Sequence, residues 1–272
     1  MTIILVSLVC LGILGIVFGA GLAIASRRFH VDVDPRVEEI LEALPNANCG
    51  ACGYAGCAAF AVAVANGEAP VDGCVPGGAE YARVVAAIMG VEAAGPEPRR
   101  AVVRCQGGRA EARREADYAG VRDCRAAALI QGGPKACKHG CLGFGTCAAV
   151  CPFDAITMSP NGLPVISEER CSACGLCVAA CPVGIISILP SRYRVYLACS
   201  NPAKGKTVKE ICSVGCISCR QCVKATESGA IQWGDGLPKI DFEKWTDPDA
   251  ALTKCPMNCF ADARVGLAAA EV

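Results

Sequence analysis

The chain has 272 residues, which leaves room for one to three domains, and its 26 Lys and Arg balance 26 Asp and Glu. This neutrality predicts no nucleic-acid partner. Because 22 cysteines accompany only 5% aromatic residues, we expect bound metal groups, rather than a large hydrocarbon core, to stabilise the fold. The cysteines recur at C-x2-C and C-x3-C spacings, which are typical of metal sites and not of a secreted disulfide scaffold.

The first predicted element is a membrane anchor over residues 1–28. Residues 2–26 contain no charged side chain, and this length is enough to span a bilayer. Arg27 and Arg28 follow directly and nothing positive precedes the segment, so the positive-inside rule places the rest of the chain in the cytoplasm. The alternative is a cleaved signal peptide, with a cleavage site near Ala25. Such a peptide has a positive leader and a shorter apolar core, and the sequence therefore favours a retained anchor.

A small helical domain is predicted over residues 29–91. An amphipathic helix falls within residues 30–44, with Asp34 as its N-cap and Pro35 at the first helical position. A second helix, rich in Ala and Val, covers residues 79–90 and ends at Gly90. Residues 92–100 contain prolines and charges, which indicates a linker and a domain boundary.

This small domain contains a motif for one metal group. Its four cysteines are separated by two, four and sixteen residues, and intervening glycines let the backbone fold around the group. The spacing suits one 4Fe–4S cluster, although a zinc ion fits it nearly as well. The candidate ligands are Cys49, Cys52, Cys57 and Cys74.

Residues 92–132 are expected to form a linker and the start of a ferredoxin region, and residues 133–191 a ferredoxin-like domain with two clusters. Cys171–Pro182 reads C-x2-C-x2-C-x3-C-P, the bacterial ferredoxin run whose fourth cysteine ligates the other cluster. A looser run, spaced x3, x5 and x3, ends in Cys151-Pro152, and a strand is expected over residues 163–166. His139 is expected to donate a hydrogen bond rather than to ligate. Cross-ligation predicts one cluster on Cys137, Cys141, Cys147 and Cys181, and another on Cys151, Cys171, Cys174 and Cys177.

Residues 192–272 predict a degenerate third ferredoxin-like region with a C-terminal tail. One cysteine triplet has Thr226 where its fourth cysteine would fall, and Cys255-Pro256 has Trp245 where a triplet would begin. The simplest interpretation is a unit with one cluster, held by Cys216, Cys219, Cys222 and Cys255. A fifth cluster could use Cys105, Cys124, Cys199 and Cys212, with buried free thiols as the alternative. Cys259 has no assigned role.

The order of these parts resembles the B subunit of the Rnf (also called Rsx) ion-translocating oxidoreductases of bacterial membranes. The resemblance covers roughly residues 1–235 and is carried by NCGACGYAGC, DCRAA, GGPKACKHGCLGFGTCAAVCPFDAI and CSACGLCVAACP. It implies a single-pass protein of the bacterial inner (cytoplasmic) membrane, with residues 2–26 in lipid and the cysteine-rich part on the cytoplasmic side. It also implies that Cys49, Cys52, Cys57, Cys74 and the eight cysteines of the double ferredoxin run are cluster ligands.

The same resemblance implies a function. On this resemblance we expect the protein to relay single electrons between soluble ferredoxin and flavin-bearing membrane subunits, whose redox reaction drives Na+ or H+ across the membrane. Its partners are these subunits and ferredoxin, and it acts as an electron-transfer subunit of a translocase. We expect three 4Fe–4S clusters, a fourth near Cys216 and a candidate fifth.

The residues themselves favour a relay over a catalytic pocket. The sequence contains no Gly-rich dinucleotide fingerprint opening a βαβ unit and no nucleophile–base pair, so we expect the remaining chemistry on partner subunits. One alternative is a subunit of another membrane oxidoreductase, such as a formate dehydrogenase or hydrogenase, and another is a zinc scaffold. The predicted fold class is α+β, with a transmembrane helix, a small helical 4Fe–4S domain and ferredoxin-like two-cluster domains.

Overall fold

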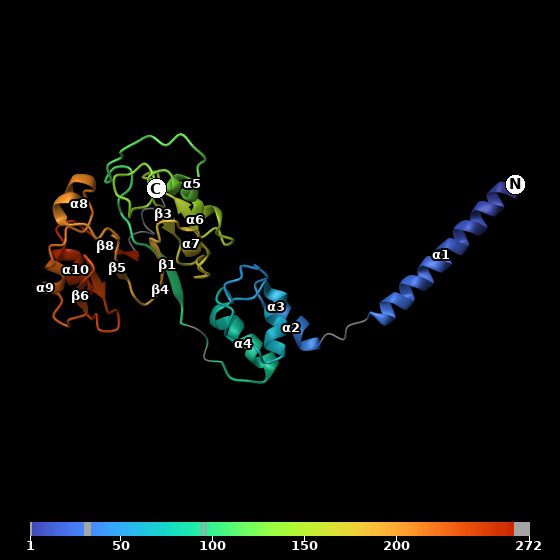
Figure 1. The fold of residues 1–272 in the computed structure, drawn as a ribbon. Coiled ribbons are helices and arrows are strands. Elements are labelled where there is room, and N and C mark those ends of the chain that lie inside the picture. Colours follow the sequence, from blue (N-terminus) through green and yellow to red (C-terminus); the bar gives the residue numbers. More distant parts are fainter. Residues whose placement is uncertain (1, 30–33, 94, 96, 264–272) are drawn as a thin grey trace.

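The computed structural model describes residues 2–29, 34–93, 95 and 97–263. Figure 1 shows a long helix, α1, then a group of helices, α2 to α4, and then two units that contain the strands β1 to β8. All strands pair in antiparallel two-stranded sheets. This combination of helices and strands confirms the predicted α+β class.

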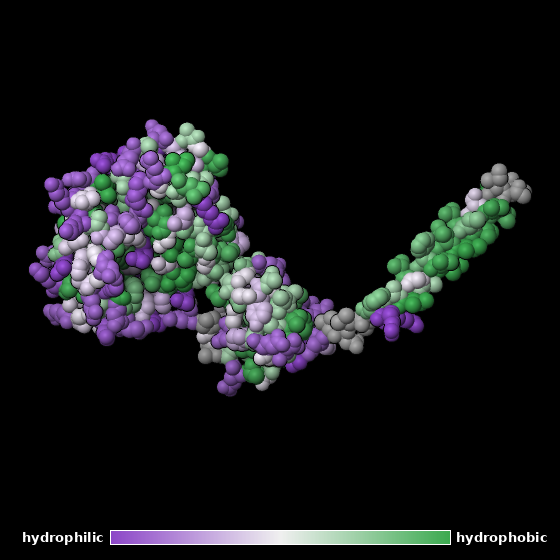
Figure 2. Space-filling model, viewed as in Figure 1, coloured by the Kyte–Doolittle hydropathy of each residue, from purple (hydrophilic) through white to green (hydrophobic). Residues whose placement is uncertain are grey.

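Helix α1 (Thr2–Arg28) carries an apolar surface over Ile4–Arg28 that is not covered by any other described part of the chain. Among the described helices it alone is long and apolar enough to cross a membrane, and Figure 2 shows its hydrophobic surface. Arg27 and Arg28 lie in its last turn. An exposed apolar surface of this length needs an apolar surrounding, and a bilayer core matches its length.

The small domain packs three helices around one core: α2 (Pro35–Ala43), α3 (Cys57–Ala65) and α4 (Gly78–Met89). Asp34 caps α2 by accepting a hydrogen bond from Arg36 N at 2.9 Å, as predicted. Residues 30–33 of the predicted first helix lie outside the described residues. Ile40 and Phe60 are buried at the centre of the core, and α4 ends at Gly90, whose φ of 67° lies in the left-handed region.

The first ferredoxin-like unit pairs its outer strands and its inner strands. Strand β1 (Arg99–Val103) pairs with β4 (Ile186–Pro190), and β2 (Ile156–Met158) forms a hairpin with β3 (Pro164–Ile166). Three short helices accompany them: α5 (Cys124–Leu129), α6 (Thr146–Ala149) and α7 (Leu176–Ala180). The unit therefore begins at β1, inside the segment expected to start the ferredoxin region.

The second ferredoxin-like unit repeats this topology. Its outer strands β5 (Val195–Leu197) and β8 (Phe260–Asp262) pair, and β6 (Ile231–Gly234) forms a hairpin with β7 (Leu237–Ile240). Helices α9 (Gln221–Ala225) and α10 (Pro248–Lys254) take the places of α6 and α7, and α8 (Gly205–Ile211) is an addition. This region, expected from the sequence to be a degenerate ferredoxin-like region, therefore has the strand pairing of the first unit.

A buried arginine ties the first strand to the connection between the two units. Arg100 is 4% exposed and donates to Glu168 Oε1 at 2.6 Å. It also donates to the carbonyl oxygens of Ser191 and Tyr193 at 2.9 and 2.8 Å. Hydrogen bonds from a charged donor contribute more than neutral ones, so Arg100 fixes the chain where it passes from β4 to β5.

Candidate metal-cluster sites

The four cysteines of the small domain come from the loop before α3, the start of α3 and the segment between α3 and α4. Burial raises the pKa of Cys74, and the nearby Cys57, Cys52 and Cys49 thiolates add to the rise. Asn48 Oδ1 accepts a hydrogen bond from Cys57 N at 2.9 Å. A side chain on Gly56 would place a Cβ 2.8 Å from Asn48 Oδ1, so this glycine is needed for the chain to close on the Asn48 loop.

The compact run at residues 171–182 forms a second group. Burial raises the pKa of Cys177 to about 12, with contributions from the Cys171 and Cys174 thiolates. At Cys174, the nearby Cys151 thiolate also raises the pKa, after burial as the main cause. Ala101 N, on β1, donates a hydrogen bond to Cys171 Sγ at 3.4 Å. The structure thus brings together the expected set of Cys151, Cys171, Cys174 and Cys177.

A third group lines a pocket beside α6, and its membership differs from the expected set. The pocket is lined by Cys124, Cys141, Cys147 and Cys181. Cys137, which we expected here, lies in another pocket. Burial raises the pKa of Cys147 to about 11, and the Cys124 and Cys181 thiolates add to the rise.

The reason for this exchange is visible when the compact pattern is counted backwards from Cys151-Pro152. Cys147 and Cys141 occupy the third and first ligand positions, and Phe144 occupies the second. The backbone agrees with this alignment, because Gly143 and Gly145 have φ of 80°, as Ala173 and Gly175 have φ of 55° and 81° in the other loop. The loop therefore lacks one thiol that an upstream residue must supply.

Helix α5 supplies that thiol. Cys124 N donates to Thr146 Oγ1 at 2.7 Å, directly beside Cys147, and Thr146 Oγ1 in turn donates to Asp123 Oδ2 at 2.8 Å. Asp123 also caps α5 by accepting hydrogen bonds from Arg125 N and Ala126 N. This network holds Cys124 beside Cys147, where it can supply the thiol that is missing because Phe144 occupies the second ligand position.

A fourth group lies in the second ferredoxin-like unit. Its pocket is lined by the expected Cys216, Cys219, Cys222 and Cys255, and also by Cys259. Hydrogen bonds from the Cys259 thiol lower the pKa of Cys255 to about 6 and that of Cys216 to about 7. Cys259 is 1% exposed, and its equivalents after the other Cys-Pro corners, Ala155 and Ile185, are both 2% exposed. It occupies a core position, and its backbone N–H donates to Cys255 Sγ at 3.3 Å.

The second site of this unit is filled with protein. Trp245, Pro248 and Ala251 stand at the three triplet positions before Cys255-Pro256. Trp245 packs against Phe260 and Phe242, with ring centroids 6.0 Å apart in both pairs. Thr226, at the matching fourth position, is buried and donates to Cys222 O at 2.9 Å. The triplet and its partner cysteine are absent together, which agrees with one cluster in this unit.

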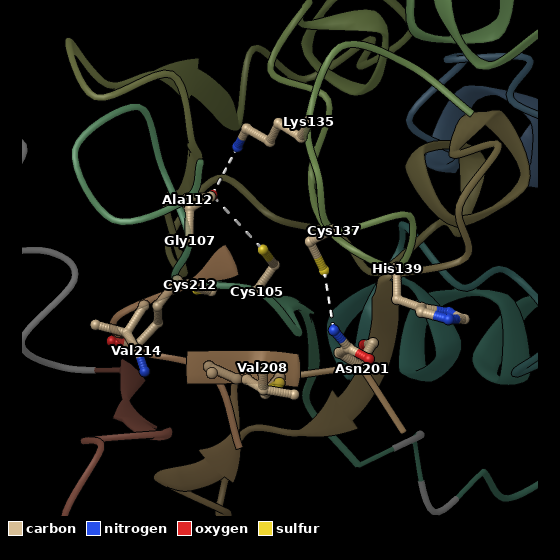
Figure 3. A pocket seen from close by; sticks show the side chains of 16 residues that line it. Cys105, Gly107, Ala112, Lys135, Cys137, His139, Asn201, Val208, Cys212 and Val214 are labelled. Carbon is tan, nitrogen blue, oxygen red and sulfur yellow. Dashed lines mark hydrogen bonds between the residues drawn. The ribbon is translucent and has the colours of Figure 1, made fainter. Parts of the chain in front are cut away.

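A further pocket collects cysteines that belong to no ferredoxin motif. It is lined by Cys105, Cys137, Cys199 and Cys212, of which Figure 3 labels Cys105, Cys137 and Cys212. Of the set expected for a fifth cluster, only Cys124 lies elsewhere. His139 also lines this pocket, and its backbone N–H donates to Cys137 Sγ. This contact involves the backbone, whereas we expected the side chain to donate.

The donor sets fit iron–sulfur clusters. All 22 cysteines are free, and no three His, Cys, Asp or Glu side chains in the described ranges converge closely enough for one metal ion. Pockets lined by four or more thiols supply the number of sulfur ligands that a 4Fe–4S cluster takes. Backbone N–H groups donate to Cys171, Cys105, Cys199 and Cys255 Sγ at 3.3 to 3.4 Å, as at cluster thiolates. Fold and sites therefore define an iron–sulfur electron-transfer protein with an N-terminal helix long and apolar enough to cross a membrane.

Comparisons with known proteins identify the family. Residues 44–76 match the family described as "Putative Fe-S cluster", and residues 135–185 match the "4Fe-4S dicluster domain" family. The chain is 45% identical to the B subunit of the Na(+)-translocating ferredoxin:NAD(+) oxidoreductase complex of Acetobacterium woodii, over 95% of this chain and 78% of that protein. It is 42% identical to the B subunit of an ion-translocating oxidoreductase complex of Methanosarcina acetivorans, over 93% and 96%.

A third relative is the B subunit of the proton-translocating ferredoxin:NAD(+) oxidoreductase complex of Clostridium ljungdahlii, 43% identical over 94% of this chain and 91% of that protein. The chain belongs to the family of B subunits of Rnf-type ion-translocating oxidoreductase complexes. It is an iron–sulfur electron-transfer subunit of such a complex, as the resemblance in the sequence implied, and not a subunit of a formate dehydrogenase or hydrogenase.

Proposed function

We propose that this chain carries single electrons between soluble ferredoxin and flavin-bearing subunits of its membrane complex. The relatives named for ferredoxin and NAD+ supply the two ends of the reaction: ferredoxin as electron donor and NAD+ as final acceptor, with Na+ or H+ as the transported ion. The flow can also run in reverse. The observation that carries the proposal is that the cysteine groups of the small domain and of the first ferredoxin-like unit lie next to one another in a row.

Four cysteine groups are proposed as the 4Fe–4S ligands of this row. The small-domain site uses Cys49, Cys52, Cys57 and Cys74. The two sites of the first ferredoxin-like unit use Cys151, Cys171, Cys174 and Cys177, and Cys124, Cys141, Cys147 and Cys181. The site of the second unit uses Cys216, Cys219, Cys222 and Cys255. When bound, each cluster takes up or releases one electron with little rearrangement.

Contacts between the groups support the row. The Cys49 thiolate of the small domain is close enough to Cys174 to raise its pKa, after burial as the main cause. Residues of the small domain and of the first ferredoxin-like unit also line a shared pocket, among them Val75 and Ser172. Cys147 lies within the same reach of Cys177. The small-domain site is therefore next to the site on Cys174, which is next to the site on Cys147.

The protein prepares each site in two ways. Backbone N–H groups aimed at sulfur stabilise negative charge there and hold the ligands in place. Apolar side chains exclude water: Ile185 and Ile186 beside the pocket of Cys181 are 2% and 3% exposed. Both features reduce the rearrangement of protein and solvent around a cluster when the cluster gains or loses an electron.

The anchor gives the row a direction. Helix α1 ends at Arg27 and Arg28, so we place the rest of the chain on the cytoplasmic side of the bacterial inner membrane. The small domain follows the anchor directly, and it is the part proposed to face the membrane subunits. Ferredoxin then meets the other end, in the ferredoxin-like units.

The test is Cys174→Ala in the complete complex, with Cys10→Ala, a change in the anchor, as the matched control. The Cys174 variant should lose about four iron atoms per chain and its ferredoxin-dependent activity, while remaining in the membrane. The control should keep its iron and its activity. Unchanged iron and an unchanged EPR spectrum in the Cys174 variant would contradict the proposal.

A further inference from the structure

Four cysteines from four separate segments surround the pocket shown in Figure 3. Cys105 follows β1, Cys137 lies before α6, Cys199 follows β5 and Cys212 caps the end of α8. Three of them lie outside the residues that match the known families, and the four follow no ferredoxin spacing. The pocket lies where the two ferredoxin-like units meet.

We propose that Cys105, Cys137, Cys199 and Cys212 hold a fifth 4Fe–4S cluster that joins the two ferredoxin-like units. This proposal rests on the proposed relay function and adds one site to it. It also replaces the set expected from the sequence, because Cys124 is engaged beside Thr146 and Cys137 takes its place.

All four sulfurs accept hydrogen bonds from the surrounding protein, Cys212 from the backbone of Val214. Asn201, which is 4% exposed, donates from Nδ2 to Cys137 Sγ at 3.4 Å. The other two donors are backbone N–H groups: Cys141 N to Cys105 Sγ and Cys216 N to Cys199 Sγ, both at 3.3 Å. Such donors are typical of cluster thiolates, whose charge they stabilise.

A buried positive charge in the same pocket points to a negative ligand. Lys135 is 5% exposed, and its Nζ donates to Gly107 O at 2.6 Å. No carboxylate among the described residues forms an ion pair with it. A buried charge is costly unless an opposite charge compensates it. A 4Fe–4S cluster with four thiolates carries a net charge of about −2 when oxidised, whereas four protonated thiols carry none.

The same contacts place the pocket between two proposed sites. Cys141, which donates to Cys105, is a proposed ligand in the first unit, and Cys216, which donates to Cys199, is one in the second. Cys141 also lies within electrostatic reach of Cys105, and Cys199 of Cys216. A cluster here therefore completes the row from the small domain to the second ferredoxin-like unit.

The test compares Cys199→Ala and Cys212→Ala with the anchor control Cys10→Ala in the full-length chain, purified anaerobically in detergent. Two measurements, native mass spectrometry and chemical analysis of iron and sulfide, should give about 20 iron atoms for the unmodified chain and for the control. Each pocket variant should contain about 16 iron atoms. Spin counting by EPR after full reduction should fall by one cluster in each pocket variant.

Several results would overturn the fifth cluster. These are about 16 iron atoms in the unmodified chain, unchanged iron in both pocket variants, or one zinc ion per chain that both variants lose. If the variants do not accumulate, the iron and sulfide content of the unmodified chain decides between five clusters, with about 20 iron atoms, and four clusters, with about 16. Cys174→Ala, measured in parallel, separates this failure from failure of the relay, because it should still lose about four iron atoms if the other four clusters are present.

Discussion

Lys135 should set the reduction potential of the cluster in the pocket of Figure 3. Its buried Nζ contributes a positive charge to a pocket lined by four cysteines. For a charge placed about 7 Å from a redox centre, at an effective dielectric constant of about 20, Coulomb's law gives a change of about 2 kcal/mol in the free energy of adding an electron. For a one-electron couple this corresponds to about 100 mV. Lys135→Met keeps the side-chain length and should lower the potential by about that amount, because the reduced cluster is the more negative state.

The assay is an anaerobic redox titration followed by EPR on the full-length chain. Lys138→Met is the matched control, because Lys138 is 42% exposed and its charge is paired with Glu115 at 3.2 Å. Solvent screening should keep the control within about 20 mV of the unmodified chain. A shift below about 30 mV in Lys135→Met, or a shift to higher potential, would refute the assignment of this charge to the pocket. Loss of one cluster from the variant would show that the charge is needed for binding as well.

Three other changes test the scaffold, each followed by anaerobic denaturation or heating with iron release as the signal. Arg100→Leu should lower the free energy of unfolding by about 3 kcal/mol, because it removes a charged donor to three oxygens. The control Arg99→Leu, at an exposed position, should change the free energy of unfolding by under about 0.5 kcal/mol. Equal effects of the two substitutions would contradict the role of Arg100. Trp245→Ala should cost about 3 kcal/mol without loss of iron, and a loss of four iron atoms would contradict a purely structural role for Trp245. Gly143→Ala should destabilise the protein more than Gly175→Ala. Both glycines have φ near 80°, but only at Gly143 would a Cβ meet a carbonyl oxygen, that of Gly162 at 2.8 Å. Gly175→Ala alone should lower the free energy of unfolding by about 1 kcal/mol.

Local spacing predicted those parts of the molecule that local geometry controls. The cap at Asp34, the stop at Gly90 and the strand near residue 165 follow from a few adjacent residues, and the structure has all three. The cysteines of the compact run at 171–177 were grouped from sequence for the same reason. Their loop is short, and its ligands are fixed by backbone conformation at Ala173 and Gly175.

The sequence spacing did not identify a candidate ligand that lies far along the chain from its motif. Cys137 precedes Cys141 by four residues, which made it the natural member of the run, but the loop that repeats the ferredoxin conformation begins at Cys141. Counting back from Cys151-Pro152 would have placed Phe144 at the second ligand position and shown that a thiol was missing. Nothing in the spacing names Cys124 as the replacement, because its place depends on hydrogen bonds to Thr146, 22 residues away.

The pocket of Cys105 and Cys212 also bears on how the protein matures. Its walls come from both ferredoxin-like units, and the last wall residues, Val214 and Gly215, are synthesised long after Cys105. A nascent chain can complete its small domain early, but this junction must wait until most of the polypeptide has left the ribosome. Until then the early thiols stay exposed to oxidants, so biogenesis of this protein depends on a reducing cell interior and on iron delivery late in synthesis.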